Sequence, residues 1–278
     1  MARRLAPRLS RLPVGAQRAQ TLRLPASLQI AYVNEWERLV REMHKEVSAT
    51  VLREFAKPVA TGSAEDAKES VWERMLRRFS ERFATVAPGL ANGMMKRLER
   101  DAELGLQRSL REVAEGFTLT PNNPKNVQKA IDDKVKENVF YIKRIPEQYL
   151  ESVKKSVDAS IAAGGNGLED LTKVMNERYG EAKRHAKNVA LDQTRKAYTA
   201  INTARMKDAG IKKFEWVHTG GSQEPRPYHL NDLNGRIFDI DEPPIIDEKT
   251  GERGLPGDAI NCRCTMRPIV TFDFEDDE

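Results

Sequence analysis

Apolar residues recur every three or four positions through most of the chain before residue 210, the spacing that one buried face of an α-helix requires. The clearest stripe covers residues 32–55, and two more cover residues 71–83 and 94–113. Pro88-Gly89 lies between the last two stripes, so the pattern predicts two helices with a break between them. Methionine and aromatic residues at this spacing indicate a packed core.

The helical pattern continues in shorter pieces after the third stripe. Apolar spacing over 127–135 predicts a short helix, and Pro146 is placed to begin another, because the first helical turn tolerates proline. A helix over 168–175 and an alanine-rich helix over 182–209 follow. Gly210 then ends the last helix, since glycine adopts the positive φ that this position often needs.

After residue 210 the hydrophobic period changes from 3.6 to 2, which indicates β-strands. Residues 214–218 alternate Phe, Trp and His with Glu and Val, and two more short strands are predicted at 236–238 and 262–268. Asn234-Gly235 favours a type I′ turn. The fold is therefore predicted to be mainly α, with an elongated helical body followed by a small C-terminal α+β module and flexible charged termini.

Composition divides the chain into four predicted parts: a basic flexible arm (1–27), a helical domain (28–210), the α+β module (211–272) and an acidic tail (273–278). The net charge is only +4, but no acidic residue precedes Glu35. Arginine pairs well with phosphate. We therefore interpret the arm as a contact for DNA or for a partner protein, the alternative being a tail that only adds solubility. Its arginines are Arg3, Arg4, Arg8, Arg11, Arg18 and Arg23.

The cysteine and apolar content exclude two classes of protein. No apolar run approaches the ~20 residues that cross a bilayer, which excludes a membrane protein. The N-terminus also lacks the apolar core of a secretory signal. The only two cysteines are one residue apart, which rules out a disulfide framework and fits a reducing compartment.

The α+β module contains two histidines and two cysteines, the residue types that bind structural zinc. They are His218, His229, Cys262 and Cys264. Residues two apart in an extended strand lie ~6.6 Å from each other, whereas sulfurs that share a tetrahedral zinc lie within roughly 4 Å. The chain would therefore have to turn at Arg263. We expect the cysteines to be small buried core residues and no cofactor to be needed, with a structural zinc as the alternative.

Catalysis is the less favoured interpretation of the same residues. A cysteine and a histidine could act as nucleophile and base, with Glu224 or Asp232 orienting the histidine. The chain has no glycine-rich phosphate loop, no HExxH sequence and no nucleophile elbow. We therefore expect no enzyme. The alternatives are a metal-dependent hydrolase or a nucleic-acid-binding protein that uses the His/Cys module.

The C-terminal half contains an ordered series of short motifs, whose residues are Trp216, Arg226, His229, Gly235, Asn261, Cys262, Arg263 and Cys264. Through this series the chain resembles, over residues 145–270, the phage Mu F-like and SPP1 portal-associated minor head proteins, the phage head morphogenesis family. Many members have an aspartate where this chain has Ser222-Gln223-Glu224-Pro225.

The resemblance implies a minor capsid protein of a tailed bacteriophage, associated with the portal and acting in head assembly or in DNA packaging and delivery. It places the protein in the virion, inside the capsid near the portal vertex, and in the host cytoplasm during assembly. The implied partners are the portal protein, the major capsid or scaffolding protein and packaged double-stranded DNA, with no membrane involved in assembly.

Overall fold

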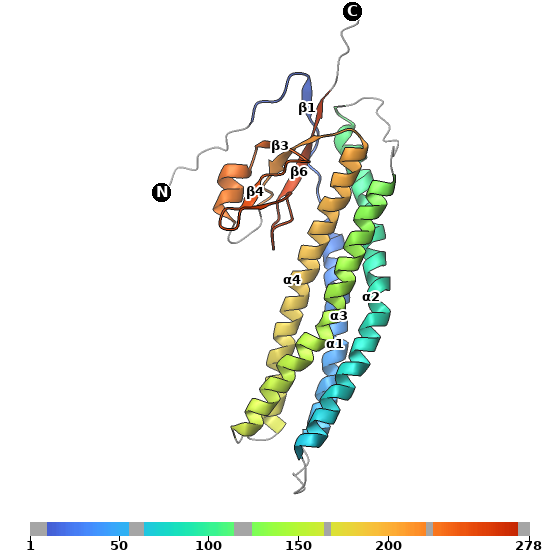
Figure 1. Ribbon diagram of the computed structural model, residues 1–278, viewed down its shortest axis with the longest axis vertical. Helices are drawn as coiled ribbons and strands as arrows, with labels where there is room; N and C mark the ends of the chain where they lie inside the picture. The colour runs from blue at the N-terminus through green and yellow to red at the C-terminus, as the bar shows by residue number, and fades with distance from the viewer. Residues whose placement is uncertain (1–9, 56–63, 114–123, 164–167, 221–224, 272–278) are drawn as a thin grey trace, which may run out of the picture. The chain divides into compact units, whose positions relative to one another are not determined.

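The computed structural model describes residues 10–55, 64–113, 124–163, 168–220 and 225–271 (Figure 1). This part of the chain is 68% helical, which confirms the mainly α fold with a small strand-containing C-terminal region. No helix in it is both long and apolar enough to cross a membrane. The long helices are α1 (Ala26–Phe55), α2 (Ala64–Leu110), α3 (Pro124–Ala162) and α4 (Leu168–Asp208).

Helices α2, α3 and α4 are longer than the sequence predicts, because the expected breaks are absent. Helix α2 continues through Pro88 and α3 through Pro146. Around Pro88 the buried face is continuous, with Phe83, Ala87 and Ala91 at most 1% exposed, while the proline itself points to solvent. Burial of such a stripe outweighs the ~3 kcal/mol that an interior proline costs. The prediction of breaks was therefore wrong.

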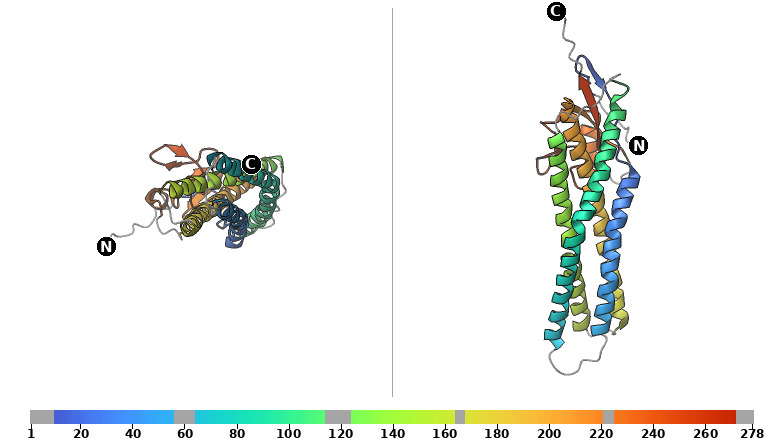
Figure 2. Two further views of the ribbon diagram at one scale, coloured as in Figure 1. Left: turned by 90° about the horizontal axis from the view of Figure 1, so that it is seen from below. Right: turned by 90° about the vertical axis from the view of Figure 1, so that its right-hand side faces the viewer.

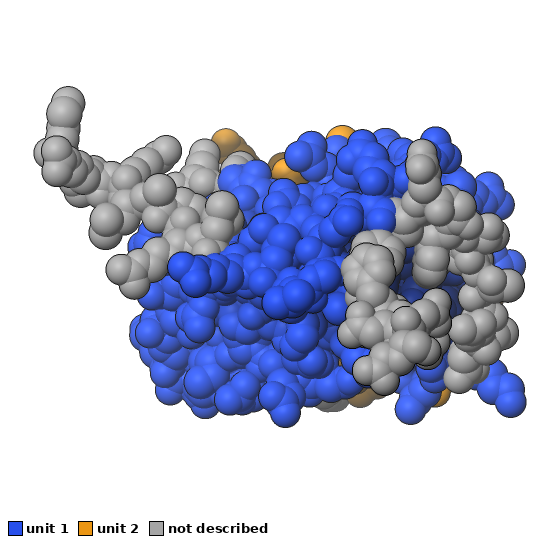
Figure 3. Space-filling model, turned by 90° about the horizontal axis from the view of Figure 1, so that it is seen from above, with its two compact units in different colours: residues 1–28, 95–134, 192–278 blue, residues 29–94, 135–191 orange. Residues whose placement is uncertain are grey.

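The chain forms two compact units (Figure 3). The helical unit consists of residues 29–94 and 135–191, and the sheet unit of residues 1–28, 95–134 and 192–278. The sequence instead suggested a boundary near residue 210. The structure groups parts of α2, α3 and α4 with the strands, because the strands and their loops are bonded to those helical segments.

The helical unit packs α1 beside segments of the other three helices (Figure 2). Its core includes the fully buried Trp36, and the Tyr32 hydroxyl donates a 2.8 Å hydrogen bond to the Asn138 side chain. Arg82 of α2 binds the carboxylates of Glu42 and Glu46 on α1. The predicted amphipathic stripe of α1 is confirmed, since its apolar residues form this core.

A half-buried histidine packs against two tyrosines in the helical unit. The ring of His44 stacks on Tyr179 with centroids 4.3 Å apart, and its Nδ1 is hydrogen-bonded to the Tyr149 hydroxyl at 2.7 Å. Ser48 lies one helical turn away, 3.2 Å from the same nitrogen. Burial lowers the pKa of His44, because the charged ring would lose hydration.

We expect the stability of the protein to fall as the pH drops below about 6.5, the unfolded-state pKa of histidine. A base whose pKa is lowered by folding binds its proton more readily in the unfolded chain, so acid favours unfolding. Melting temperatures between pH 5 and 8, compared with those of His44→Gln, test this. Parallel pH profiles of the two proteins would show that His44 is not responsible.

The strands form a four-stranded antiparallel sheet in the order β1-β6-β2-β3 and a two-stranded β4–β5 ribbon. Strands β2 and β3 confirm the predicted strands at 214–218 and 236–238. The third strand lies further along the chain than the predicted 262–268, because β6 begins after both cysteines and continues beyond Pro268. The strands are β1 (Ala16–Arg18), β2 (Lys213–Val217), β3 (Ile237–Asp239), β4 (Ile245–Asp247), β5 (Glu252–Arg253) and β6 (Thr265–Thr271).

The described part of the expected N-terminal arm is a component of the sheet unit. Strand β1 pairs with β6, and Ala16 lies opposite Thr271. Leu22 is 1% exposed, and its N–H donates a 3.0 Å hydrogen bond to the Met266 carbonyl. The expectation of a flexible arm over residues 10–27 is corrected, because this segment covers the edge of β6 and buries apolar side chains. Arg3, Arg4, Arg8 and the acidic tail lie outside the described residues.

A buried carboxylate ties three strands of this sheet together. Glu215 of β2 is 3% exposed and binds Arg18 of β1. Its other oxygen accepts a 2.9 Å hydrogen bond from Arg267 of β6, the residue directly opposite it. The alternating sequence pattern indicated only one apolar face here. The structure shows that this glutamate side of β2 is also covered, by an ion-paired cluster.

Candidate metal centre

His229 is buried and oriented by a backbone carbonyl. It begins a π-helical turn over His229–Leu233, its side chain is 1% exposed, and its Nε2 lies 2.8 Å from the Ile246 oxygen. With Nε2–H donating to that carbonyl, Nδ1 is left as the lone-pair nitrogen. The edge of the ring meets Trp216 at a centroid distance of 5.2 Å. The catalytic interpretation named Glu224 or Asp232 as the residue that orients this histidine. Glu224 lies outside the described residues and Asp232 is exposed, whereas the Ile246 carbonyl orients the ring.

Both cysteine sulfurs lie next to His229 Nδ1. Cys262 Sγ is 3.5 Å and Cys264 Sγ 3.8 Å from that nitrogen. The Cys264 N–H also donates to Cys262 Sγ across 3.4 Å, so the chain turns sharply between the two residues. These three ligand atoms all lie within 4.8 Å of one another, and all three side chains are buried. The turn at Arg263 that a shared metal requires is therefore present.

The distances fit a tetrahedral zinc. Zn–S bonds of about 2.3 Å and Zn–N bonds of about 2.0 Å separate sulfur from nitrogen by about 3.5 Å at a tetrahedral centre. His218 Nδ1 lies 3.5 Å from Cys264 Sγ but is not one of the three atoms that all lie within 4.8 Å of one another, so it would have to move closer to act as a fourth ligand. The bond from His229 to the Ile246 carbonyl is the outer-shell contact that fixes a metal-binding histidine. The geometry thus favours the alternative that the sequence ranked second.

The electrostatics of the cluster suit a cation. The pKa of Cys262 is lowered, first by the hydrogen bond from the Cys264 thiol and then, against the effect of burial, by His229 and backbone N–H groups. The same hydrogen bond between the two cysteine side chains, together with burial, raises the pKa of Cys264. Burial lowers the pKa of His218, which keeps its ring neutral as a metal ligand must be. For His229, burial lowers the pKa, but the hydrogen bonds with Cys262 and the Ile246 carbonyl raise it, and the net shift is upward.

Helix α4 holds the cysteine loop in place. The Asn261 N–H, at a residue with φ of 59°, donates a 2.9 Å hydrogen bond to Asp192 Oδ1. The other oxygen of Asp192 binds Lys196 at 2.9 Å. Further along the helix, the Thr199 hydroxyl donates a 2.6 Å bond to the Pro256 carbonyl. Thr199 carried no signal in the sequence, because nothing indicated which helical face meets this loop.

We expect Gly257→Ala to destabilise the protein by about 1–3 kcal/mol, because this glycine has a positive φ and a close neighbour. Its φ is 101°, and an added Cβ would lie 2.9 Å from Thr199 Oγ1. Chemical denaturation measures the loss. Gly89→Ala is the matched control, since this helical glycine has open space around it and alanine should stabilise the helix by about 0.5–1 kcal/mol. Equal effects of the two changes would contradict the prediction.

The other signature residues shape the same loops. Arg226 donates a 2.8 Å hydrogen bond to the Ile260 carbonyl, and the Thr219 hydroxyl donates a 2.6 Å bond to the Arg263 carbonyl. Asn234 has φ −59° and ψ 129° and Gly235 has φ 79°, the geometry of a type II turn. The predicted type I′ turn was therefore wrong, because asparagine here keeps a negative φ.

Fold and site together define a mainly helical protein whose small sheet unit carries a buried Cys/His cluster. Residues 151–267 match the family described as "Phage Mu protein F like protein". This match confirms the resemblance seen in the sequence and suggests a phage head-related, virion-associated protein.

One curated relative matches over most of this chain. It is an uncharacterized protein of Haemophilus influenzae, 23% identical over 264 residues. The match covers 92% of this chain and 56% of the relative, so the chain spans about half the length of the curated protein it matches. No solved structure matches the chain.

Proposed function

We propose that this protein is a minor head protein of a tailed bacteriophage, bound at the portal vertex inside the capsid and acting in head assembly or in DNA packaging and delivery. The observation that carries the proposal is the family match over residues 151–267, which includes β2, β3 and every member of the Cys/His cluster. The partners we propose are the portal protein and the major capsid or scaffolding protein, met in the host cytoplasm during assembly.

The role that we propose for the Cys/His cluster is structural, with zinc as the bound ion. Structural zinc sites use four protein ligands, whereas catalytic ones keep a position open for water. His218, His229, Cys262 and Cys264 supply four donors, and three of them are buried. A bound zinc would join the loop after β2, the π-helical turn and the loop before β6. The protein is accordingly proposed to have no enzymatic activity.

Purified heads of the phage that encodes this chain provide the test of the head role. Mass spectrometry should find the chain in mature heads, in far fewer copies than the major capsid protein, and cross-linked to the portal protein. Heads made without its gene should be defective in assembly or in DNA delivery. Absence of the chain from washed heads, together with normal infectivity of heads that lack it, would refute the proposal.

A hydrolase that uses the same cluster is the second candidate function, favoured by the two histidines and two cysteines in contact. The substitution His229→Ala distinguishes the two functions, because they predict different effects on metal content, melting temperature and hydrolysis. For a structural site, the variant loses metal and melting temperature together, and no substrate is turned over by the native protein. A variant that keeps its native melting temperature but abolishes hydrolysis of a phosphodiester or peptide substrate would establish the hydrolase.

A further inference from the structure

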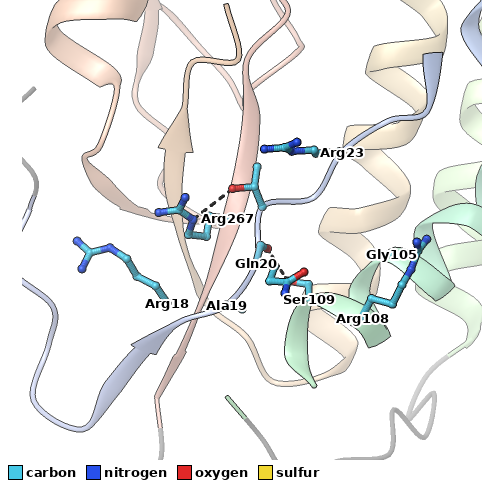
Figure 4. A pocket seen from close by; sticks show the side chains of 9 residues that line it. Arg18, Ala19, Gln20, Arg23, Gly105, Arg108, Ser109 and Arg267 are labelled. Carbon is cyan, nitrogen blue, oxygen red and sulfur yellow. Dashed lines mark hydrogen bonds between the residues drawn. The ribbon is translucent and has the colours of Figure 1, made fainter. Parts of the chain in front are cut away.

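A cavity of about 610 Å³ in the sheet unit is lined by arginines from three separate elements (Figure 4). Arg18 and Arg23 come from the N-terminal segment, Arg108 from the end of α2 and Arg267 from β6. The residues that line it include no carboxylate. The remaining lining residues are Ala19, Gln20, Thr21, Gly105 and Ser109.

Two of the arginines are fixed in place by the interior of the unit. Arg18 and Arg267 share the buried carboxylate of Glu215, which can balance only one of their two charges. Arg267 also donates a 3.2 Å hydrogen bond to the Thr21 hydroxyl, which Figure 4 shows as a dashed line. These guanidinium groups are therefore ordered before any ligand binds, so little side-chain entropy is lost on binding.

The other two arginines face solvent. Arg23 and Arg108 are exposed, and Arg108 uses its Nε to bind the Leu104 carbonyl of its own helix. Two carboxylates lie beside the lining residues: Glu112 accepts a hydrogen bond from Gln20, and Asp101 interacts with Arg108. The four arginines outnumber these two carboxylates and Glu215, so the surroundings of the cavity carry a net positive charge.

We propose that this arginine cavity binds the phosphate groups of a nucleic acid backbone. Guanidinium groups pair with phosphate oxygens through two parallel hydrogen bonds, and hydroxyl and amide side chains such as Thr21 and Gln20 are common phosphate partners. Arginines spread over three elements suit successive phosphates rather than one small anion. A protein-docking surface usually has an apolar centre, and Ala19 is the only apolar side chain in this lining.

The site is separate from the Cys/His cluster and does not depend on the proposed head function. Two of the arginines that the sequence assigned to a flexible arm, Arg18 and Arg23, belong to it, while Arg11 is exposed and does not line the cavity. Arg108 and Arg267 lie far along the chain, and only the fold shows that they join the first two.

Fluorescence anisotropy of the full chain with a labelled short DNA duplex, between about 50 and 200 mM salt, tests the proposal. The double variant Arg23→Gln/Arg108→Gln should bind about tenfold more weakly at the lower salt concentration. Its plot of log affinity against log salt should be shallower by about 1.8, because each lost phosphate contact contributes about 0.9. These arginines are exposed, so the fold should survive, which a melting curve verifies.

The control is Arg41→Gln/Arg77→Gln, which removes the same charge from exposed positions of the helical unit. It should retain the affinity and salt dependence of the unchanged protein. Equal losses in the two double variants would mean that net charge, not the cavity, binds DNA, and would overturn the proposal. So would binding of a polyglutamate peptide without DNA binding, or displacement of DNA by inorganic phosphate at equal phosphate concentration.

Discussion

Purified protein is expected to contain about one zinc ion per chain, and Cys264→Ser is expected to lose it. Cys264 Sγ contacts both histidine Nδ1 atoms, at 3.5 Å and 3.8 Å, so this substitution removes the sulfur that touches both nitrogen donors. A ligand at about 1,000 times its Kd stabilises the folded state by about 4 kcal/mol. For a chain of this size that loss lowers the melting temperature by roughly 10 °C.

Elemental mass spectrometry and melting curves on the same samples measure both effects. His185→Asn is the control, because this histidine belongs to the helical unit and the cluster to the sheet unit, so the variant should keep the metal. A chelator should lower the melting temperature of the native protein but not that of Cys264→Ser. Native protein that is free of metal, with a melting temperature unaffected by added zinc, would leave the cysteines as packing residues.

The helical body was predictable from the sequence because amphipathic spacing is a local signal. The stripe of α1 and the start of the β pattern after residue 210 both follow from residues near one another in the chain. The breaks at Pro88 and Pro146 were predicted wrongly for the same reason. The effect of a proline on its own helix can be read from the sequence. The apolar contacts that stabilise α2 on both sides of Pro88 are made with neighbouring helices, and the sequence does not show them.

The donor types of the candidate site were also visible in the sequence, but their geometry was not. Cys262 and Cys264 looked too far apart because an extended strand was assumed. The turn that brings them together depends on Asn261 bonded to Asp192, a helical residue 69 positions away. Contacts of that kind have no periodicity to reveal them, and the same holds for the partners of Glu215.

Replacing both arginines that bind Glu215 is expected to cost about 3–5 kcal/mol of stability, because a buried charge is left without a partner. The change is Arg18→Met/Arg267→Met, which keeps most of the side-chain length. Glu215 is 3% exposed, so water cannot replace the lost guanidinium groups without opening the sheet. Urea denaturation, analysed by linear extrapolation, measures the difference from the unchanged protein.

The added change Glu215→Met separates the cost of the unpaired charge from the loss of arginine packing. Apolar residues of similar volume often replace a buried ion pair without loss of stability, so the triple variant should recover most of what the double variant loses. Recovery in the triple variant would show that packing stabilises the sheet at this point and that the arginines serve mainly to neutralise the buried carboxylate. A triple variant as unstable as the double one would contradict this, and would assign the stability to the arginines' other contacts, such as those with Ser10 and Thr21. The arginines would then anchor the N-terminal segment to the sheet independently of the carboxylate they share.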